Sequence, residues 1–290
     1  MESSNAPHTP TSPARDYAAQ LRRAGQLAST HPASREILAF YSRILSFQKS
    51  LDTQIAASAP RQSPQFSSLR DSLDLTLLLP HFCPFLALIK EHAPQPLAVA
   101  AHELLSLPSD EWIHLLTSFW RFGGLPEQPE PETGLHVFPP KVFGQFFPRA
   151  FLAPYAARLA ARSAVPPAVS TPSLCPLCAA RPFLGILRPE GDGGKRSLLC
   201  SFCGTEWNYR RILCPCCGES DEPKLPVFIA DQFPHIRTES CDTCRAYLRT
   251  IDLTKDGHAV PPVDDLAALP LSLWAHEHAY TRLHPNLLAT

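Results

Sequence analysis

Eight cysteines, arranged in four Cys-x-x-Cys pairs, constrain the fold of this chain more than any other feature. The pairs are Cys175/Cys178, Cys200/Cys203, Cys214/Cys217 and Cys241/Cys244. A tetrathiolate metal site takes four sulfurs, and a two-residue spacer lets one tight turn present two thiolates to the same ion. The sequence therefore predicts two metal ions. Tetrahedral sulfur suits zinc and iron equally, so the ligands alone do not identify the metal.

The spacing favours a sequential pairing of these motifs. The two pairs of the first candidate site are separated by 21 residues and those of the second by 23, as in two-knuckle ribbon modules. Only ten residues separate the second pair from the third. The simplest arrangement places the first two pairs on one ion and the last two on the other. A crossed arrangement, first pair with third and second with fourth, is the alternative.

Two further cysteines stand outside the pairs. Cys216 lies inside the third pair, and we expect it to be a non-ligand, because a knuckle turn uses the sulfurs at the two ends of its four-residue unit. An alternative ligand or a reactive thiol are the other interpretations of Cys216. Cys83 lies in the apolar stretch HFCPFLALI, which predicts a buried side chain. The histidines form no metal-ligand pattern.

The composition and the charge of the chain indicate its cellular compartment and the class of partner that it binds. The 290 residues are 44% hydrophobic and carry a formal charge of −1, which predicts a folded chain with no general attraction to nucleic acid. Residues 173–250 hold ten basic and nine acidic side chains. Two divalent ions on eight thiolates would bring that region to about −3. The N-terminus has no apolar core for a secretory signal, and no run of about 18 apolar residues occurs. We therefore expect a cytoplasmic protein without a membrane span, whose cysteines bind metal and do not form disulfides.

The pattern along the chain predicts an α+β protein. We expect a disordered tail (1–14), an all-helical domain (15–163), a proline-rich linker (164–173), two four-cysteine modules (174–212 and 213–258), and a C-terminal helix and tail (259–290). Helical spacing is clearest from Ile37 to Ile55, with Ser34 as its candidate N-cap. Residues 142–159 predict two short helices. Asp264 and Asp265 are expected to open the C-terminal helix, where the helix dipole favours acids.

The candidate chemistry is structural. A closed four-thiolate shell leaves no open position for a substrate, and the sequence has no Gly-rich phosphate loop, G-x-S-x-G or H-E-x-x-H motif. We therefore expect no enzymatic activity and assign no catalytic residue. Trp207, Tyr209 and Arg210 lie between the two sites and are candidate partner contacts, because aromatic and Arg side chains dominate interface hot spots. The alternative is that Trp207 packs between the two modules.

The cysteine-rich half resembles the formate dehydrogenase accessory protein family, FdhE type. The resemblance lies in CPLC, CSFCGTEWNYRRILCPCCG, ESCDTCRAYLRTID and PPVDDLAALPLSLWAHEHAY, taken in order. THPASREILAFYSRIL is the nearest shared segment in the helical half. The added cysteine in CPCC and the proline-rich N-terminal tail depart from the family pattern.

The resemblance implies a helical domain joined to two rubredoxin-like, zinc-ribbon-type modules, with the eight paired cysteines as ligands of two iron or zinc ions. It also implies a non-catalytic maturation factor that binds the molybdenum-containing catalytic subunit of a respiratory formate dehydrogenase before its export. The resemblance leaves the oligomeric state undetermined, with a homo-oligomer as one alternative. The alternatives are a nucleic-acid-binding zinc ribbon and an iron-dependent redox or electron-transfer protein.

Overall fold

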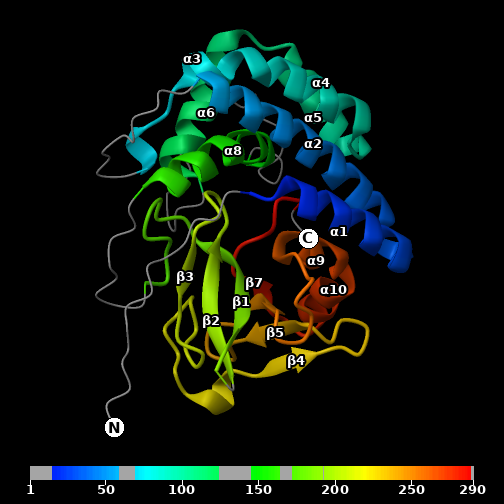
Figure 1. The fold of residues 1–290 in the computed structure, drawn as a ribbon, viewed down its shortest axis with the longest axis vertical. Helices are drawn as coiled ribbons and strands as arrows, with labels where there is room; N and C mark the ends of the chain where they lie inside the picture. Colours follow the sequence, from blue (N-terminus) through cyan, green and yellow to red (C-terminus); the bar gives the residue numbers. More distant parts are fainter. Residues whose placement is uncertain (1–14, 59–68, 124–144, 164–171, 192, 289–290) are drawn as a thin grey trace.

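The computed structural model describes residues 15–58, 69–123, 145–163, 172–191 and 193–288. The predicted tail (1–14), most of the predicted linker (164–173) and the first part of the predicted helix pair near Val142 lie outside these residues. The described chain is α+β, as predicted: helices come first, and a sheet region that carries both cysteine clusters and two C-terminal helices follows (Figure 1). No helix in the described residues is long and apolar enough to cross a membrane.

The N-terminal helices pack around one apolar core. The main helices are α1 (Tyr17–Thr30), α2 (Arg35–Ser58), α4 (Phe82–His92), α5 (Gln95–Leu105), α6 (Ser109–Phe122) and α8 (Phe146–Arg162), with the short α3 (Leu75–Leu78) and 3-10 turns at Pro32–Ser34, Leu69–Asp71 and Leu79–His81. Ser34 does not cap α2 as predicted. It lies in the turn before that helix, and its hydroxyl donates to the carbonyl of Ala267 at 2.7 Å, so it joins α2 to the C-terminal helices.

Helix α8 forms the centre of the helical part. Almost all of its residues are buried, and Phe147 and Phe151 are fully enclosed. The sequence suggested two short helices here, but residues 146–162 form a single one. Pro148 lies in its first turn, where a missing N–H has no consequence. Pro154 lies inside the helix, where proline normally costs about 3 kcal/mol, so packing on every side must offset that cost.

The cysteine-rich half contributes one sheet, in the strand order β3-β2-β1-β6-β5-β4, with β7 pairing with β6. The strands are β1 (Pro182–Glu190), β2 (Gly193–Cys200), β3 (Glu206–Asn208), β4 (Val227–Ile229), β5 (Ile236–Ser240), β6 (Ala246–Asp252) and β7 (Thr281–Arg282); a 3-10 turn spans Glu222–Lys224. Strands β1 and β2 form an antiparallel hairpin, with Glu190 opposite Gly193. Strand β1 pairs in parallel with β6, with Leu184 opposite Arg249. The two cysteine modules therefore share a single sheet.

Helices α9 (Pro261–Ala267) and α10 (Leu269–Glu277) pack against one face of the sheet. Ile236 and Ile251 of the sheet meet Ala268 and Leu271 of the helices in a small core. Helix α9 also contacts α1 and α2, so the C-terminal helices hold the helical part and the sheet together (Figure 1).

Candidate metal centres

All four Cys-x-x-Cys motifs adopt the same turn. In each, the N–H of the first cysteine donates to the carbonyl five residues later, and the residue after the second cysteine has a positive φ. The acceptors are Ala180, Thr205, Glu219 and Ala246, at 2.8–2.9 Å, and the positive-φ residues are Ala179, Gly204, Gly218 and Arg245. Glycine accepts that conformation without strain, which explains Gly204 and Gly218. The turn aims both thiols of a pair to the same side.

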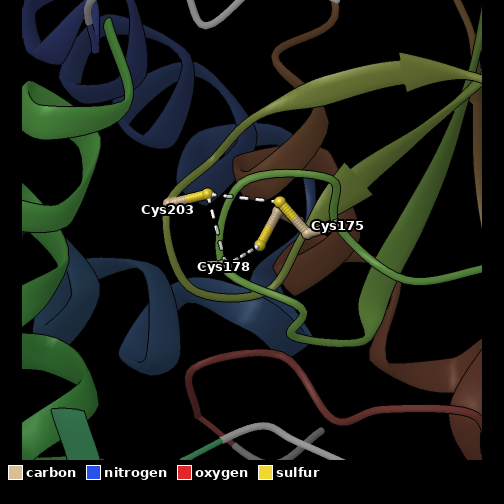
Figure 2. A group of neighbouring side chains, drawn as sticks. Cys175, Cys178 and Cys203 are labelled. Carbon is tan, nitrogen blue, oxygen red and sulfur yellow. Dashed lines mark hydrogen bonds between the residues drawn. The ribbon is translucent and has the colours of Figure 1, made fainter. Parts of the chain in front are cut away.

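The first cluster joins Cys175, Cys178, Cys200 and Cys203. Figure 2 shows three of these thiols pointing toward one another, Cys175 and Cys178 from the turn before β1 and Cys203 from the turn after β2. The sulfurs of Cys175 and Cys203 lie 3.5 Å apart, and those of Cys178 and Cys200 lie 3.4 Å apart. A tetrahedron with metal–sulfur bonds of about 2.3 Å has edges of about 3.8 Å, whereas a disulfide needs about 2.05 Å. The spacing therefore fits a four-thiolate metal site and is too long for disulfides.

The second cluster joins Cys214, Cys217, Cys241 and Cys244 in the same way. Its sulfurs lie 3.8 Å apart between Cys214 and Cys244 and 3.7 Å apart between Cys217 and Cys241. Among the described residues the thiols thus gather in the sequential arrangement, first pair with second and third with fourth, and the crossed arrangement does not occur.

The two clusters differ in their surroundings. Every cysteine of the first is at most 3% exposed, and the cluster is part of the same apolar core as Phe119, Trp120 and Phe202. In the second cluster Cys217 is exposed and Cys244 is half-buried. The first cluster therefore lies inside the junction between helices and sheet, and the second lies at the rim of the sheet.

Burial also sets the acidity of the thiols. It raises the pKa of Cys175 and Cys178 well above the ordinary value, because a thiolate there would lose its hydration. Burial acts in the same direction on Cys200, but hydrogen bonds from the other three thiols outweigh it and lower the pKa of Cys200. In the second cluster burial raises the pKa of Cys214 to about 11. Without a bound cation, the thiols of Cys175, Cys178 and Cys214 would therefore stay protonated at neutral pH.

Arg70 connects the first cluster to the helices. Its Nε donates to the carbonyl of Cys178 at 2.9 Å, and its Nη2 donates to the carbonyl of Gly123, at the C-terminal end of α6, at 2.7 Å. The guanidinium also lies 5.0 Å from the centre of the Phe202 ring. One cation thus binds a knuckle turn and a helix C-terminus, where the helix dipole favours positive charge.

Two of the three predicted partner contacts are wrong, because their side chains are buried. Trp207 is 2% exposed and donates to the carbonyl of Pro172 at 2.8 Å, and Tyr209 is 6% exposed and donates to the carbonyl of Cys214. Neither is available to a partner. Trp207 is buried in the apolar core that the helices share with the first cluster. Arg210 is exposed and precedes Arg211 and Ile212, which are exposed as well.

Cys216 and Cys83 lie outside both clusters. The side chain of Cys216 is exposed and outside the second cluster, while its N–H donates to the sulfur of Cys214. The prediction for Cys83 was wrong, because its side chain is exposed. It occupies the first turn of α4, where Phe82 and Phe85 on the buried face account for the apolar character of the segment.

Sequence reasoning missed the role of the adjacent acids of α9. Asp264 and Asp265 are 1% and 0% exposed. Asp264 binds Arg23 of α1 and lies 2.9 Å from His235, and together with His235 and Asp256 it forms a third group of potential ligand atoms. Arg23 also donates to Asp256, so a cationic side chain already binds both carboxylates of that group. The DD pair was the only signal in the sequence.

Two family models match this chain. The model "FdhE, central domain" covers residues 174–211, and the model "FdhE, C-terminal domain" covers residues 212–289. The first range contains the first cysteine cluster, and the second range contains the second cluster.

Similar whole proteins carry the same family name. The chain is 28% identical over 279 residues to a protein FdhE homolog of Aquifex aeolicus, an alignment that covers 92% of this chain and 93% of that protein. It is 40% identical over 121 residues to a protein FdhE homolog of Pseudomonas aeruginosa, but that alignment covers only 40% of this chain and 39% of the relative. The crystal structure of the FdhE protein from Pseudomonas aeruginosa superposes over 97% of both chains, with a TM-score of 0.61 and 27% identity.

Proposed function

The chain belongs to the FdhE family, and from that premise we propose that it is a non-catalytic maturation factor for a formate dehydrogenase. It binds the molybdenum-containing catalytic subunit in the cytoplasm, before export, and is needed for the activity or assembly of that enzyme. The family membership carries the proposal. The geometry supports it, because two clusters of four thiols provide a scaffold and leave no ligand position for a substrate.

The eight paired cysteines would hold two metal ions, iron or zinc. Bound metal supplies folding free energy, roughly 10 kcal/mol or more per structural site at neutral pH, and acts as a cross-link between knuckle turns. In the first cluster that cross-link joins Cys175 and Cys178, before β1, to Cys200 and Cys203, at the end of β2. In the second it joins the turn after β3 to the turn between β5 and β6.

The loop between the clusters supports a revised location for the partner contact. Arg210, Arg211 and Ile212 are exposed, and Ile212 is 42% exposed although it is a large aliphatic residue. The loop borders a groove of about 410 Å³ lined by apolar residues of β1, β4 and β6 and by Arg237. We assign this loop to contact with the catalytic subunit, since exposed Arg and large apolar side chains favour protein interfaces.

A co-purification experiment tests the function and the face separately. The tagged full-length protein, co-expressed with the catalytic subunit of a formate dehydrogenase, should retain that subunit. Ile212→Asp should reduce its recovery severalfold. Val99→Asp is the matched control, because Val99 is 50% exposed on the distant helix α5. No recovery by the unaltered protein would contradict the function, whereas equal recovery by both variants would contradict only the proposed face.

Exposure of the second cluster favours one further candidate, an iron-dependent redox protein. Cys217 at the surface would bring an iron ion near a redox partner, which the buried first cluster would not allow. Metal analysis of protein purified without oxygen distinguishes the candidates, because a preparation that contains only zinc excludes the redox role.

A further inference from the structure

A second kind of site lies where α1, α2 and α8 meet β1, β2 and the C-terminal segment. A cavity of about 280 Å³ opens there, close to the lower limit for small-molecule sites. Its apolar walls include Phe183, Ile186 and Leu266, and its polar lining comes from both the helical part and the sheet. It is separate from the groove beside the second cysteine cluster.

Arg149 of α8 brings a buried positive charge to this cavity. It is 8% exposed, and it donates through Nε and Nη1 to the carbonyls of Ser201, Pro285 and Asn286 at 3.0–3.1 Å. Burial lowers the pKa of Arg149 to about 10, so it stays protonated at neutral pH. Among the described residues no carboxylate pairs with it, and its Nη2 makes no hydrogen bond. A buried cation without a counter-charge is costly, which favours an anion beside it.

Other unused donors line the same cavity. The hydroxyl of Ser201 is buried and has no hydrogen-bond partner in the described part of the chain. Within the described ranges, which begin at residue 15, the hydrogen bond of Arg15 there is a long one, from Nη1 to Gln48 at 3.5 Å. The side chain of Gln20 accepts a hydrogen bond from Tyr41 through Oε1, and its amide nitrogen makes none within the same residues.

The acids in the lining are already engaged. Glu206 accepts two hydrogen bonds from Arg188, at 2.9 and 2.8 Å, and Asp16 caps α1 by accepting the N–H of Ala19 at 2.9 Å. Among the described residues, the lining therefore still offers donor groups, on Arg15, Arg149, Ser201 and Gln20. Such an inventory suits a ligand that only accepts hydrogen bonds.

We propose that this cavity binds a small monocarboxylate through Arg149, Arg15 and Ser201. Nη2 of Arg149, the Arg15 guanidinium and the Ser201 hydroxyl can each donate a hydrogen bond to a carboxylate oxygen, and the apolar walls accommodate a short hydrocarbon body. A single negative charge suits the site better than a dianion, because Cys200 of the first cluster also lines the cavity and four thiolates on a divalent ion carry a net charge of −2. Phosphate and sulfate should therefore bind less well than a monocarboxylate.

Titration of the full-length, metal-loaded protein tests the proposal, with formate, butyrate and benzoate as probes at constant ionic strength. We expect saturable binding by calorimetry and a matching rise in the thermal midpoint, strongest for butyrate or benzoate. Arg15→Gln and Ser201→Ala should each weaken binding roughly tenfold or more, the effect of losing a charge-assisted hydrogen bond. Arg22→Gln, at an exposed position on α1, should bind as the unaltered protein does.

Three results would overturn the proposal. One is the absence of saturable binding by all three carboxylates at millimolar concentration. Another is an equal response to phosphate, sulfate and carboxylates that Ser201→Ala leaves unchanged, which indicates a general salt effect. The third is binding that appears only after metal removal, which would show that the metal–thiolate cluster is the counter-charge of Arg149. Arg15→Gln and Ser201→Ala keep the test valid even if a change of Arg149 itself prevents folding.

Discussion

Asp265 of α9 is the best single position at which to test how the C-terminal helices hold the molecule together. Its carboxylate is fully buried and lies 2.8 Å from Nε of Arg249, on strand β6. It also accepts hydrogen bonds from Arg282 of β7 at 2.7 and 2.9 Å, and one from Asn286 at 2.8 Å. One side chain thus serves a helix, two strands and the C-terminal segment.

Asp265→Asn removes the charge and keeps the shape, so its cost comes from the cations left behind. Breaking a buried ion pair by removing one partner costs about 3–5 kcal/mol. Arg249 is 0% exposed and the Arg282 side chain is 8% exposed, so solvent relieves neither, and we expect a loss near 5 kcal/mol. Folded proteins are stable by only about 5–15 kcal/mol, so this loss should lower the thermal midpoint by about 10 °C or more.

Urea unfolding followed by circular dichroism, at a fixed zinc concentration, measures this loss. The control is Glu190→Gln, which removes an exposed ion pair with Lys195 and should cost under about 1 kcal/mol. The double variant Asp265→Asn/Arg249→Met should recover part of the loss, because it removes a buried charge together with its partner. A loss under about 1 kcal/mol for Asp265→Asn, or a double variant no more stable than the single one, would refute the electrostatic explanation.

Three further outcomes follow from the same contacts. A chelator should remove metal in two phases, first from the second cluster, where Cys217 is exposed, and from the first cluster only when the protein unfolds. Cys217→Ser should abolish the fast phase in a metal-release assay. A single phase in the unaltered protein would argue against a difference in accessibility between the two clusters. Burial lowers the pKa of His284 from 6.5 to about 3, so the neutral imidazole stabilises the fold above pH 6.5 and this contribution declines as the pH falls toward 3. Between pH 7 and 5.5, the free energy of unfolding in urea should fall by about 1 kcal/mol less for His284→Gln than for the unaltered protein. Equal decreases would contradict this. Arg70→Met should lower the free energy of unfolding by about 2–4 kcal/mol and increase hydrogen exchange at the C-terminal end of α6. The control Arg121→Met, at an exposed position, should change neither quantity, and equal effects of the two variants would contradict the role of Arg70.

The sequence was most informative where structure is local. A Cys-x-x-Cys motif fixes its own turn, so the grouping of the thiols followed from spacing alone. The single sheet did not, because the parallel pairing of Leu184 with Arg249 joins residues far apart in the chain. Each module on its own is compatible with a separate ribbon, and no residue in either indicates the pairing.

Charged residues were harder to interpret, because their role depends on distant partners. Asp264 and Asp265 fit the opening of a helix, and they do lie in α9. Their burial depends on Arg23, Arg249 and Arg282, which come from three other elements. Trp207 shows the same limit for aromatic residues, because its type suits both an interface and a core, and only the fold distinguishes them.

The same knuckle turn therefore serves two purposes in one molecule. At the first cluster Arg70 and the apolar residues of α6 enclose the thiols, so metal there would bind the helices and the sheet into one unit. At the second cluster Cys217 is exposed, and the loop ending in Ile212 leads directly into it. A partner bound at that loop would contact the environment of the second cluster and leave the first unchanged. Metal binding at the second cluster is thus the property that partner binding should alter.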